Sequence, residues 1–319
     1  MTGPSVRTAR SLSWLPAGVQ RDFPLRRLTT IRTGGVAEFF ARPGSAEQLE
    51  ELLAWAKSVA VEVGVVGSGS NLLVADAGVP GLVIKLDGAF TEIDTSPGDE
   101  GRLRCGAGAR LPAVAAAAAT AGLSGIEFGI SIPGTVGGAV RMNANAYGGS
   151  LAAVLEWVDV TSGVGTQRRR PTELGFAYRR SNLADGEIVV SAGFSLSRAE
   201  PELVKVTLAQ LRRRRRAAQP AGIRTFGSTF RNPSDPRAEG RTAGQLLDAA
   251  GCRGLRIGNA GFSEKHANFI QNFGDATTAE VVAVMSEGHR RVRELFGVSL
   301  QPEVQTLGQV GFPDDWWSL

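Results

Sequence analysis

Cysteine and histidine are scarce in this sequence. Its 319 residues include two cysteines and two histidines. Cys105 and Cys252 lie far apart and match neither a disulfide framework nor the spacing of metal ligands. We therefore expect both thiols to stay reduced, as they do in the cytoplasm, and we expect no metal site.

Long apolar runs are also missing. No stretch is long and apolar enough to span a bilayer, and the N-terminus lacks the apolar segment of a secretion signal. This absence excludes membrane insertion and favours a cytoplasmic protein. The composition of residues 1–20 predicts a flexible N-terminal extension.

Positive charge is modest overall and concentrated in one place. The net charge of +4 and pI near 9.5 are typical of a protein with an anionic partner. The run Arg212–Arg216 could indicate nucleic-acid binding, but it lacks interleaved aromatic residues and ends an apolar, helix-like stretch before Pro220. Because cations stabilise the C-terminal end of a helix, we predict a solvated helix end and no nucleic-acid partner. A nucleic-acid binder stays the less favoured alternative.

Glycine is abundant, with 41 residues, and helix-like and strand-like segments alternate along the chain. We predict helices over 46–59, 112–122, 243–250 and 278–296, and strands over 61–66, 82–86, 155–160 and 187–196. This order indicates an α+β protein of more than one domain, without repeats. Clusters of turn residues predict the extension 1–20 and domains over 21–87, 88–217 and 218–319.

The first glycine-rich loop follows a predicted strand. It consists of Gly67, Ser68, Gly69, Ser70, Asn71 and Leu72. Glycines that adopt positive φ can turn successive N–H groups inward and form a nest for an anion such as a pyrophosphate. A dinucleotide-binding βαβ fingerprint is excluded, because Leu72 occupies its third glycine position and Asp76, Gly78 and Pro80 prevent the helix that must follow.

A second glycine-rich segment, Gly129–Ala139, has few bulky side chains. Within it stand Pro133, Gly134, Thr135, Gly137 and Gly138. Such a backbone can lie flat against a planar ring or a phosphate. Two loops of this kind could grip a dinucleotide along its length, although a glycine-rich core turn is the alternative for each of them.

Eight motifs occur in an order that resembles the UDP-N-acetylenolpyruvoylglucosamine reductase family, from about residue 28 to residue 306. They are Thr30–Gly35, Gly67–Leu73, Ile132–Ala139, Tyr178–Ser181, Gly227–Pro233, Ala243–Leu247, Ser263–Ile270 and Pro302–Val304. The short connection between Ser228 and Glu303 is similar to the branch that lacks an extra substrate-covering loop.

The resemblance implies a two-part FAD-binding unit of the vanillyl-alcohol-oxidase type, followed by a C-terminal α/β substrate-binding domain. It also implies reduction of UDP-N-acetylglucosamine enolpyruvate to UDP-N-acetylmuramate for peptidoglycan synthesis, with NADPH as the electron source. The flavin is expected to be non-covalent, because neither glycine loop contains a histidine or cysteine to tether it. The positions that would contact FAD are Arg32, Gly67, Ser68, Gly69, Ser70, Asn71, Leu72, Pro133, Gly134, Thr135, Gly137 and Gly138.

Reduction of an enol ether beside a carboxylate requires a hydride, a group that holds the developing negative charge, and a proton donor. In the resemblance, Arg179 would stabilise the charge, since a guanidinium approaches a carboxylate in a fork. Glu303 would polarise the same carboxylate or orient Arg179, and Ser228 would donate the proton to a strongly basic carbon. The residues expected to contact the substrate are Tyr178, Arg231 and Lys265.

The sequence departs from the family pattern at Ser68, Ser131 and Asn145, where glycine is usual. If these positions require positive φ, the loop geometry should differ from that of the family. These departures keep open a non-enzymatic paralogue that binds flavin or a UDP-sugar. Another FAD oxidase of the same fold is a second alternative.

Overall fold

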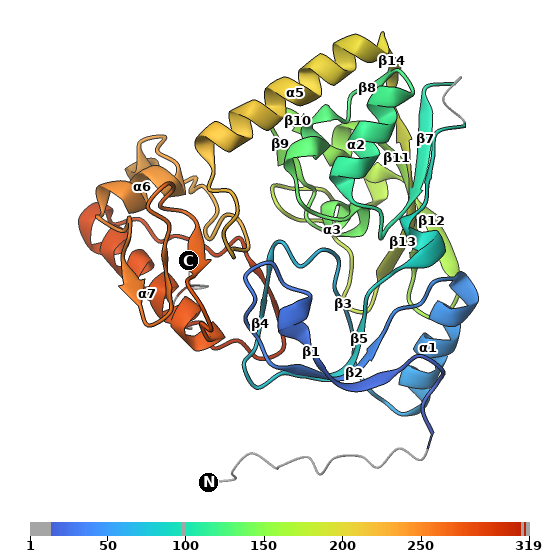
Figure 1. Cartoon of the computed structure of the whole chain (residues 1–319), viewed down its shortest axis with the longest axis horizontal. Coiled ribbons are helices and arrows are strands. Elements are labelled where there is room, and N and C mark those ends of the chain that lie inside the picture. The colour runs from blue at the N-terminus through green and yellow to red at the C-terminus, as the bar shows by residue number, and fades with distance from the viewer. Residues whose placement is uncertain (1–13, 97–99, 314–315, 317–319) are drawn as a thin grey trace.

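The computed structural model describes residues 14–96, 100–313 and 316, so residues 1–13 of the expected extension lie outside the described residues. Three main sheets and the helices packed on them make up the fold (Figure 1). Their mixed antiparallel and parallel pairing confirms the predicted α+β class.

The N-terminal sheet has the order β1-β2-β5-β3. Its strands are β1 (Gln20–Pro24), β2 (Val36–Ala41), β5 (Val79–Ile84) and β3 (Val63–Val65). β1 and β2 pair antiparallel, whereas β5 runs parallel to both β2 and β3. Helix α1 (Ala46–Ser58) begins at Ser45, whose side chain accepts a hydrogen bond from the Gln48 N–H.

Both faces of this sheet are buried in hydrophobic clusters. Neighbouring side chains on a strand point to opposite faces, so Phe39 and Phe40 of β2 enter different clusters. The Phe39 ring packs edge-on against Trp55 of α1, with 5.2 Å between ring centroids. The Phe40 ring stacks on Phe23 at 3.9 Å on the other face. Burial on two sides explains why β2 is apolar almost throughout rather than alternating.

The central sheet is antiparallel, with the order β12-β11-β13-β7-β6. Its strands are β12 (Thr166–Arg169), β11 (Leu155–Thr161), β13 (Ile188–Ser195), β7 (Arg102–Gly106) and β6 (Ile93–Asp94). The associated helices are α2 (Leu111–Thr120), α3 (Val136–Arg141), α4 (Leu151–Val154) and α5 (Pro201–Ala218). Two short antiparallel pairs complete this part: β8 (Leu123–Ser124) pairs with the distant β14 (Ser197–Arg198), and β9 (Asn145–Ala146) forms a hairpin with β10 (Gly149–Ser150).

One continuous hydrophobic core joins the first two sheets. Phe39 and Leu82 of the N-terminal sheet belong to the same buried cluster as Leu103 and Val158 of the central sheet. The predicted division at residue 87 therefore separates two segments that share a core, and it stays a prediction.

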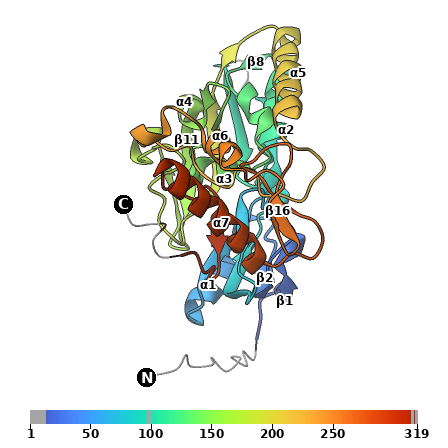
Figure 2. The same ribbon diagram turned by 90° about the vertical axis from the view of Figure 1, so that its left-hand side faces the viewer.

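The C-terminal part is a small three-stranded sheet covered by helices, with α7 facing the viewer in Figure 2. It consists of α6 (Ala243–Ala249), β15 (Arg256–Ile257), β16 (Ala260–Phe262), β17 (Ile270–Asn272) and α7 (Thr278–Phe296). Helix α7 buries Val281, Val284, Met285 and Val292, the spacing of one helical face.

The C-terminal part is tied directly to the first glycine loop. Strand β18 (Gln305–Leu307) pairs parallel with β4 (Leu72–Val74), which follows that loop. The Asp76 carboxylate accepts hydrogen bonds from the N–H groups of Thr278 and Ala279, at 2.8 and 2.9 Å, at the start of α7. The first glycine loop is thus followed by a strand, β4, and not by a helix, which agrees with the exclusion of the βαβ fingerprint.

The arginine run lies at the C-terminal end of α5, as predicted. The Lys265 ammonium also donates a hydrogen bond to the Arg216 carbonyl at 2.6 Å, adding a cation near this helix end. None of the helices in the described part of the chain combines the length and apolarity that a bilayer crossing requires.

Both cysteines are buried, and we expect them to be unreactive in the folded protein. Burial raises the pKa of Cys105 to about 12 and is the main cause that raises the pKa of Cys252 to about 11. Since the thiolate is the reactive form, the native protein should react negligibly with Ellman's reagent at pH 8, and both thiols should react after unfolding in guanidinium chloride. Rapid labelling of native protein would contradict this expectation.

Candidate active site

A cleft of about 2530 Å³ is lined mainly by the N-terminal sheet with its loops and by segments of the central part, and residues 222–224 and 305–309 of the C-terminal part complete it. Its lining contains seven of the residues expected to contact a cofactor: Arg32, Gly67, Ser68, Leu72, Thr135, Gly137 and Gly138. It also includes residues 185–189 and 305–309. Ligand pockets are usually about 300–1,000 Å³, so this cleft has room for an extended dinucleotide and a second ligand beside it.

The two glycine loops form one continuous wall. The Ser68 hydroxyl donates a hydrogen bond to the Pro133 carbonyl at 2.7 Å. A Cβ added at Gly67 would lie 2.4 Å from Thr135 Oγ1, so any side chain there would separate the loops. The remaining expected contacts, Gly69, Ser70, Asn71, Pro133 and Gly134, are not among the lining residues.

Gly69 is the position in the first loop that most strictly requires glycine. Its φ is +64°, and an added Cβ would lie 2.0 Å from the Leu28 carbonyl oxygen. Its own carbonyl accepts the Thr30 N–H at 3.1 Å, which anchors the segment that carries Arg32.

We expect the Gly69→Ala variant to purify with little or none of the coloured cofactor expected at this loop, because the loop must move to make room for the added methyl group. Absorbance per mole of protein measures this loss, and Gly148→Ala, at positive φ in open space, is the matched control.

The three departures from the family pattern do not strain the backbone. Ser68, Ser131 and Asn145 are all absent from the residues with positive φ, so none of them needs glycine. The condition under which the loop geometry would differ is therefore not met at these positions. Positive φ occurs instead at Arg32 (65°) and Arg179 (55°), two of the expected site residues.

Positive charge is concentrated where the first loop begins. The Lys85 ammonium donates to the Gly67 carbonyl at 2.6 Å, and Arg42 and Arg110 line the same cleft. Burial, followed by the charge of Arg42, lowers the pKa of Lys85. This cationic wall, the bare glycine backbone and the size of the cleft fit a dinucleotide with a diphosphate, such as FAD. Sequence reasoning missed Lys85, although a lysine directly after a buried strand is a usable signal.

Arg179 and Glu303, which are 124 residues apart, form an ion pair. The Arg179 Nε and Glu303 Oε1 atoms are 2.5 Å apart, and the two side chains are 19% and 12% exposed. The guanidinium also lies above the Tyr178 ring, 5.2 Å from its centroid. Arg179 is therefore held from two sides, by a carboxylate and by an aromatic ring.

Ser228 lies beside this pair. The Glu303 N–H donates to the carbonyl of Thr229, the residue after Ser228, at 2.8 Å. The Asn71 side-chain amide of the first loop donates to the Glu303 carbonyl at 3.1 Å. These bonds bring Arg179, Ser228 and Glu303 together near Asn71, whose neighbour Leu72 lines the cleft, although the three residues themselves are not among the lining residues.

The other expected substrate contacts are less clearly oriented. Tyr178 is 48% exposed. The Arg231 Nε atom is buried and has no partner among the described residues. Lys265 is engaged at the end of α5, so its ammonium already has a hydrogen-bond acceptor outside the cleft lining.

Both histidines make structural hydrogen bonds. His266 Nδ1 accepts from the Asn268 N–H at 3.1 Å, and burial lowers the pKa of His266. His289 Nε2 and the Ser299 hydroxyl are 3.0 Å apart. Among the described residues, no group of three or more His, Cys, Asp and Glu side chains could hold a metal ion.

Two protein-family models match this chain. The FAD binding domain matches residues 37–170, and the C-terminal domain of UDP-N-acetylenolpyruvoylglucosamine reductase matches residues 219–307. The cleft is lined by residues of both matched regions.

Proteins named as UDP-N-acetylenolpyruvoylglucosamine reductases are similar over nearly the whole chain. The protein from Novosphingobium aromaticivorans is 44% identical over 291 residues, covering 90% of this chain and 95% of that protein. One from Symbiobacterium thermophilum, named UDP-N-acetylenolpyruvoylglucosamine reductase 2, is 40% identical over 307 residues, covering 96% and 97%. The crystal structure of the reductase from Thermus caldophilus has a TM-score of 0.77 at 37% identity and covers 91% of this chain and 98% of that one.

Proposed function

The chain belongs to the UDP-N-acetylenolpyruvoylglucosamine reductase family, and we propose that it reduces UDP-N-acetylglucosamine enolpyruvate to UDP-N-acetylmuramate for peptidoglycan synthesis. FAD is the cofactor, and NADPH is the electron donor. The observation that carries this proposal is the meeting of Arg179, Glu303 and the Ser228 turn, which Asn71 links to the glycine loop of a cleft that fits a dinucleotide.

The residues that would hold FAD come from both glycine loops and their surroundings. The backbone around Gly67 and the ammonium of Lys85 suit the diphosphate, and Gly137 and Gly138 leave the wall of the cleft free of side chains. When bound, the flavin supplies the hydride that originates from NADPH. Gly69, Ser70 and Asn71 of the first loop would not contact FAD directly. They would shape the loop whose other residues line the cleft.

Arg179 would bind the carboxylate of the enolpyruvyl group and stabilise the negative charge that grows on it during reduction. A guanidinium stays charged throughout and offers two parallel N–H donors. With a side chain 19% exposed, it acts where water competes little. Its left-handed backbone conformation supports a functional role, since such strain concentrates at active sites.

Glu303 would position Arg179 before the substrate arrives. Its carboxylate occupies one side of the guanidinium, so a substrate carboxylate can approach the other N–H donors while the Nε bond remains. Its main chain is fixed by the bonds to Thr229 and Asn71, which link the same residue to the serine turn and to the first loop.

Ser228 would donate the proton that completes the reduction. The half-buried hydroxyl is one residue from Thr229, whose N–H and C=O are both bonded within the C-terminal part. A serine hydroxyl is a weak acid, but the carbon of an enediolate-like species is a strong base. Tyr178, Arg231 and Lys265 remain proposed contacts to the UDP-sugar, and we place the enzyme in the cytoplasm.

The visible spectrum of the purified protein tests this function. We expect a flavin spectrum that NADPH bleaches under anaerobic conditions and that UDP-N-acetylglucosamine enolpyruvate restores. Acid precipitation should release the yellow colour into the supernatant, because neither glycine loop offers a tether. Bleaching without recovery would instead support a non-enzymatic paralogue. Bleaching by an alcohol or sugar in the absence of NADPH, followed by recovery on admission of oxygen, would support an oxidase.

A further inference from the structure

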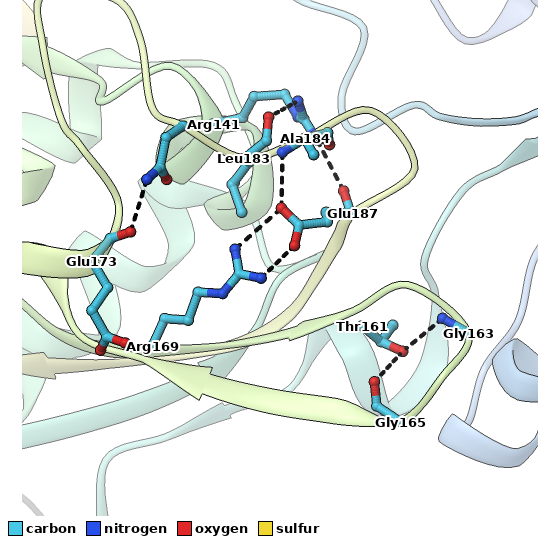
Figure 3. Close-up of polar contacts among 10 residues, drawn as sticks. Arg141, Thr161, Gly163, Gly165, Arg169, Glu173, Leu183, Ala184 and Glu187 are labelled. Carbon is cyan, nitrogen blue, oxygen red and sulfur yellow. Dashed lines mark hydrogen bonds and ion pairs between the residues drawn. The ribbon is translucent and has the colours of Figure 1, made fainter.

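Arg141 is a cation whose role the proposed reaction does not explain. It is the last residue of α3, directly after the second glycine loop, and it lines the cleft. Its guanidinium donates to three main-chain carbonyls, those of Leu183 at 3.3 Å, Ala184 at 3.2 Å and Glu187 at 2.9 Å (Figure 3). Three acceptors from one short segment indicate that the arginine shapes this segment.

We name residues 179–187 the strap. It begins at Arg179 and ends where residues 185–189 line the cleft. The Ser181 hydroxyl donates to the Arg141 carbonyl at 2.9 Å, so the strap contacts this arginine through its main chain as well as through its side chain. Arg141 therefore joins the helix that follows the second glycine loop to the strap from Ser181 to Glu187, two residues after Arg179.

Hydrophobic burial holds the strap at a single point, Leu183. Leu183 is its one buried side chain, whereas Asn182, Ala184 and residues 185–186 are exposed. Its conformation must therefore depend on polar contacts. The Glu187 carboxylate supplies a second anchor, because it accepts the Ala184 N–H at 2.8 Å and pairs with both terminal nitrogens of Arg169 (Figure 3).

The guanidinium group suits this task better than any other cation. It is planar and directs its N–H donors along several fixed directions, so it can satisfy separate carbonyls at once. A lysine ammonium would keep the charge but would concentrate its donors at a single nitrogen. Substitution by lysine therefore separates the effect of geometry from the effect of charge.

We propose that Arg141 is a positioning residue that holds the strap and thereby sets the guanidinium of Arg179 against Glu303 for reduction of the substrate. This inference rests on the proposed function. A displacement of Arg179 by about an ångström is enough to slow an oriented reaction by on the order of 100-fold. Reduction of the flavin by NADPH does not use the Arg179–substrate contact and should be affected much less.

Arg141→Lys tests the proposal in the flavin-loaded enzyme through two half-reactions and one exchange measurement. We expect reduction by NADPH to stay within about 3-fold of wild type and reoxidation by the enolpyruvyl substrate to slow by about 10- to 100-fold. Amide hydrogen exchange in peptides covering residues 177–188 should accelerate at least about 10-fold, while peptides from α7 stay unchanged. Millimolar guanidinium chloride should restore part of the reoxidation rate in Arg141→Ala.

The matched control is Arg168→Lys. Arg168 pairs with Asp159 on the neighbouring strand and has no bond to the strap, so both half-reactions and the exchange of residues 177–188 should stay as in wild type. Unchanged strap exchange in Arg141→Lys would overturn the inference, as would faster exchange with unchanged reoxidation. If wild-type enzyme is not reoxidised by the substrate, the proposed function fails, and exchange alone then decides whether Arg141 holds the strap.

Discussion

Replacing Ser228 with alanine is expected to leave reduction of the flavin by NADPH intact and nearly to stop its reoxidation by substrate. The change removes one hydroxyl and no main-chain bond, since the turn is held by the bonds of Thr229 to Asn268 and Glu303. Loss of a positioned general acid costs about 10²- to 10⁴-fold in rate. Anaerobic stopped-flow absorbance measures the two half-reactions separately in one sample.

Ser228→Cys is the matched variant for this experiment. A thiol is a stronger acid than a hydroxyl and can still donate a proton, so we expect reoxidation to recover at least in part relative to Ser228→Ala. If Ser228→Ala turns over at the wild-type rate, another group donates the proton and the assignment is wrong. Equal slowing of both half-reactions would point to a disturbed cofactor site instead.

Replacing Arg179 with alanine is expected to slow the transfer of hydride to the substrate by about 10²- to 10³-fold, equivalent to about 3–4 kcal/mol of barrier. The physical reason is that the arginine contacts a carboxylate whose negative charge increases during the reaction, so its interaction is stronger in the transition state. Single-turnover reoxidation of reduced enzyme at saturating substrate measures this step.

Arg180→Ala is the control for the Arg179 experiment. Arg180 is the adjacent residue, carries the same charge and has an exposed side chain. Arg180→Ala should therefore alter the reoxidation rate little. If Arg179→Ala weakens substrate binding but leaves the saturated rate unchanged, the arginine contributes uniform binding, and charge stabilisation is not its role.

The reoxidation rate of Glu303→Gln should fall between those of Arg179→Ala and Arg180→Ala, because an amide can still accept one hydrogen bond from Arg179.

Local signals in the sequence were sufficient for several elements. Helix α7 has the predicted bounds, Thr278–Phe296, because Thr277 and Glu280 form a capping box at its start and Gly297 adopts positive φ at its end. Helix α2 was signalled in the same way, by Pro112 in its first turn and by its run of alanines. The strand predicted over 61–66 is shorter, β3 (Val63–Val65). Propensity does not define where ladder pairing stops.

The Arg141 contacts show what sequence patterns cannot supply. Its three acceptors are main-chain carbonyls, which every residue possesses, so no residue type in the strap signals the contact. The same holds for Lys85, whose acceptor is the Gly67 carbonyl. The positive φ of Arg179 is similarly hidden, because arginine has no preference for that conformation.

The amino-acid sequence by itself determined the residue types that this chemistry needs, the order of the motifs and the caps and turns that bound several elements. Those properties depend on short-range sterics and hydrogen bonding, which neighbouring residues control. The tertiary structure alone decided that Arg179 meets Glu303 across 124 residues and that the Ser228 turn lies beside them. Such contacts arise from the packing of sheets and helices over one another, and packing follows from the whole set of buried side chains rather than from any single segment.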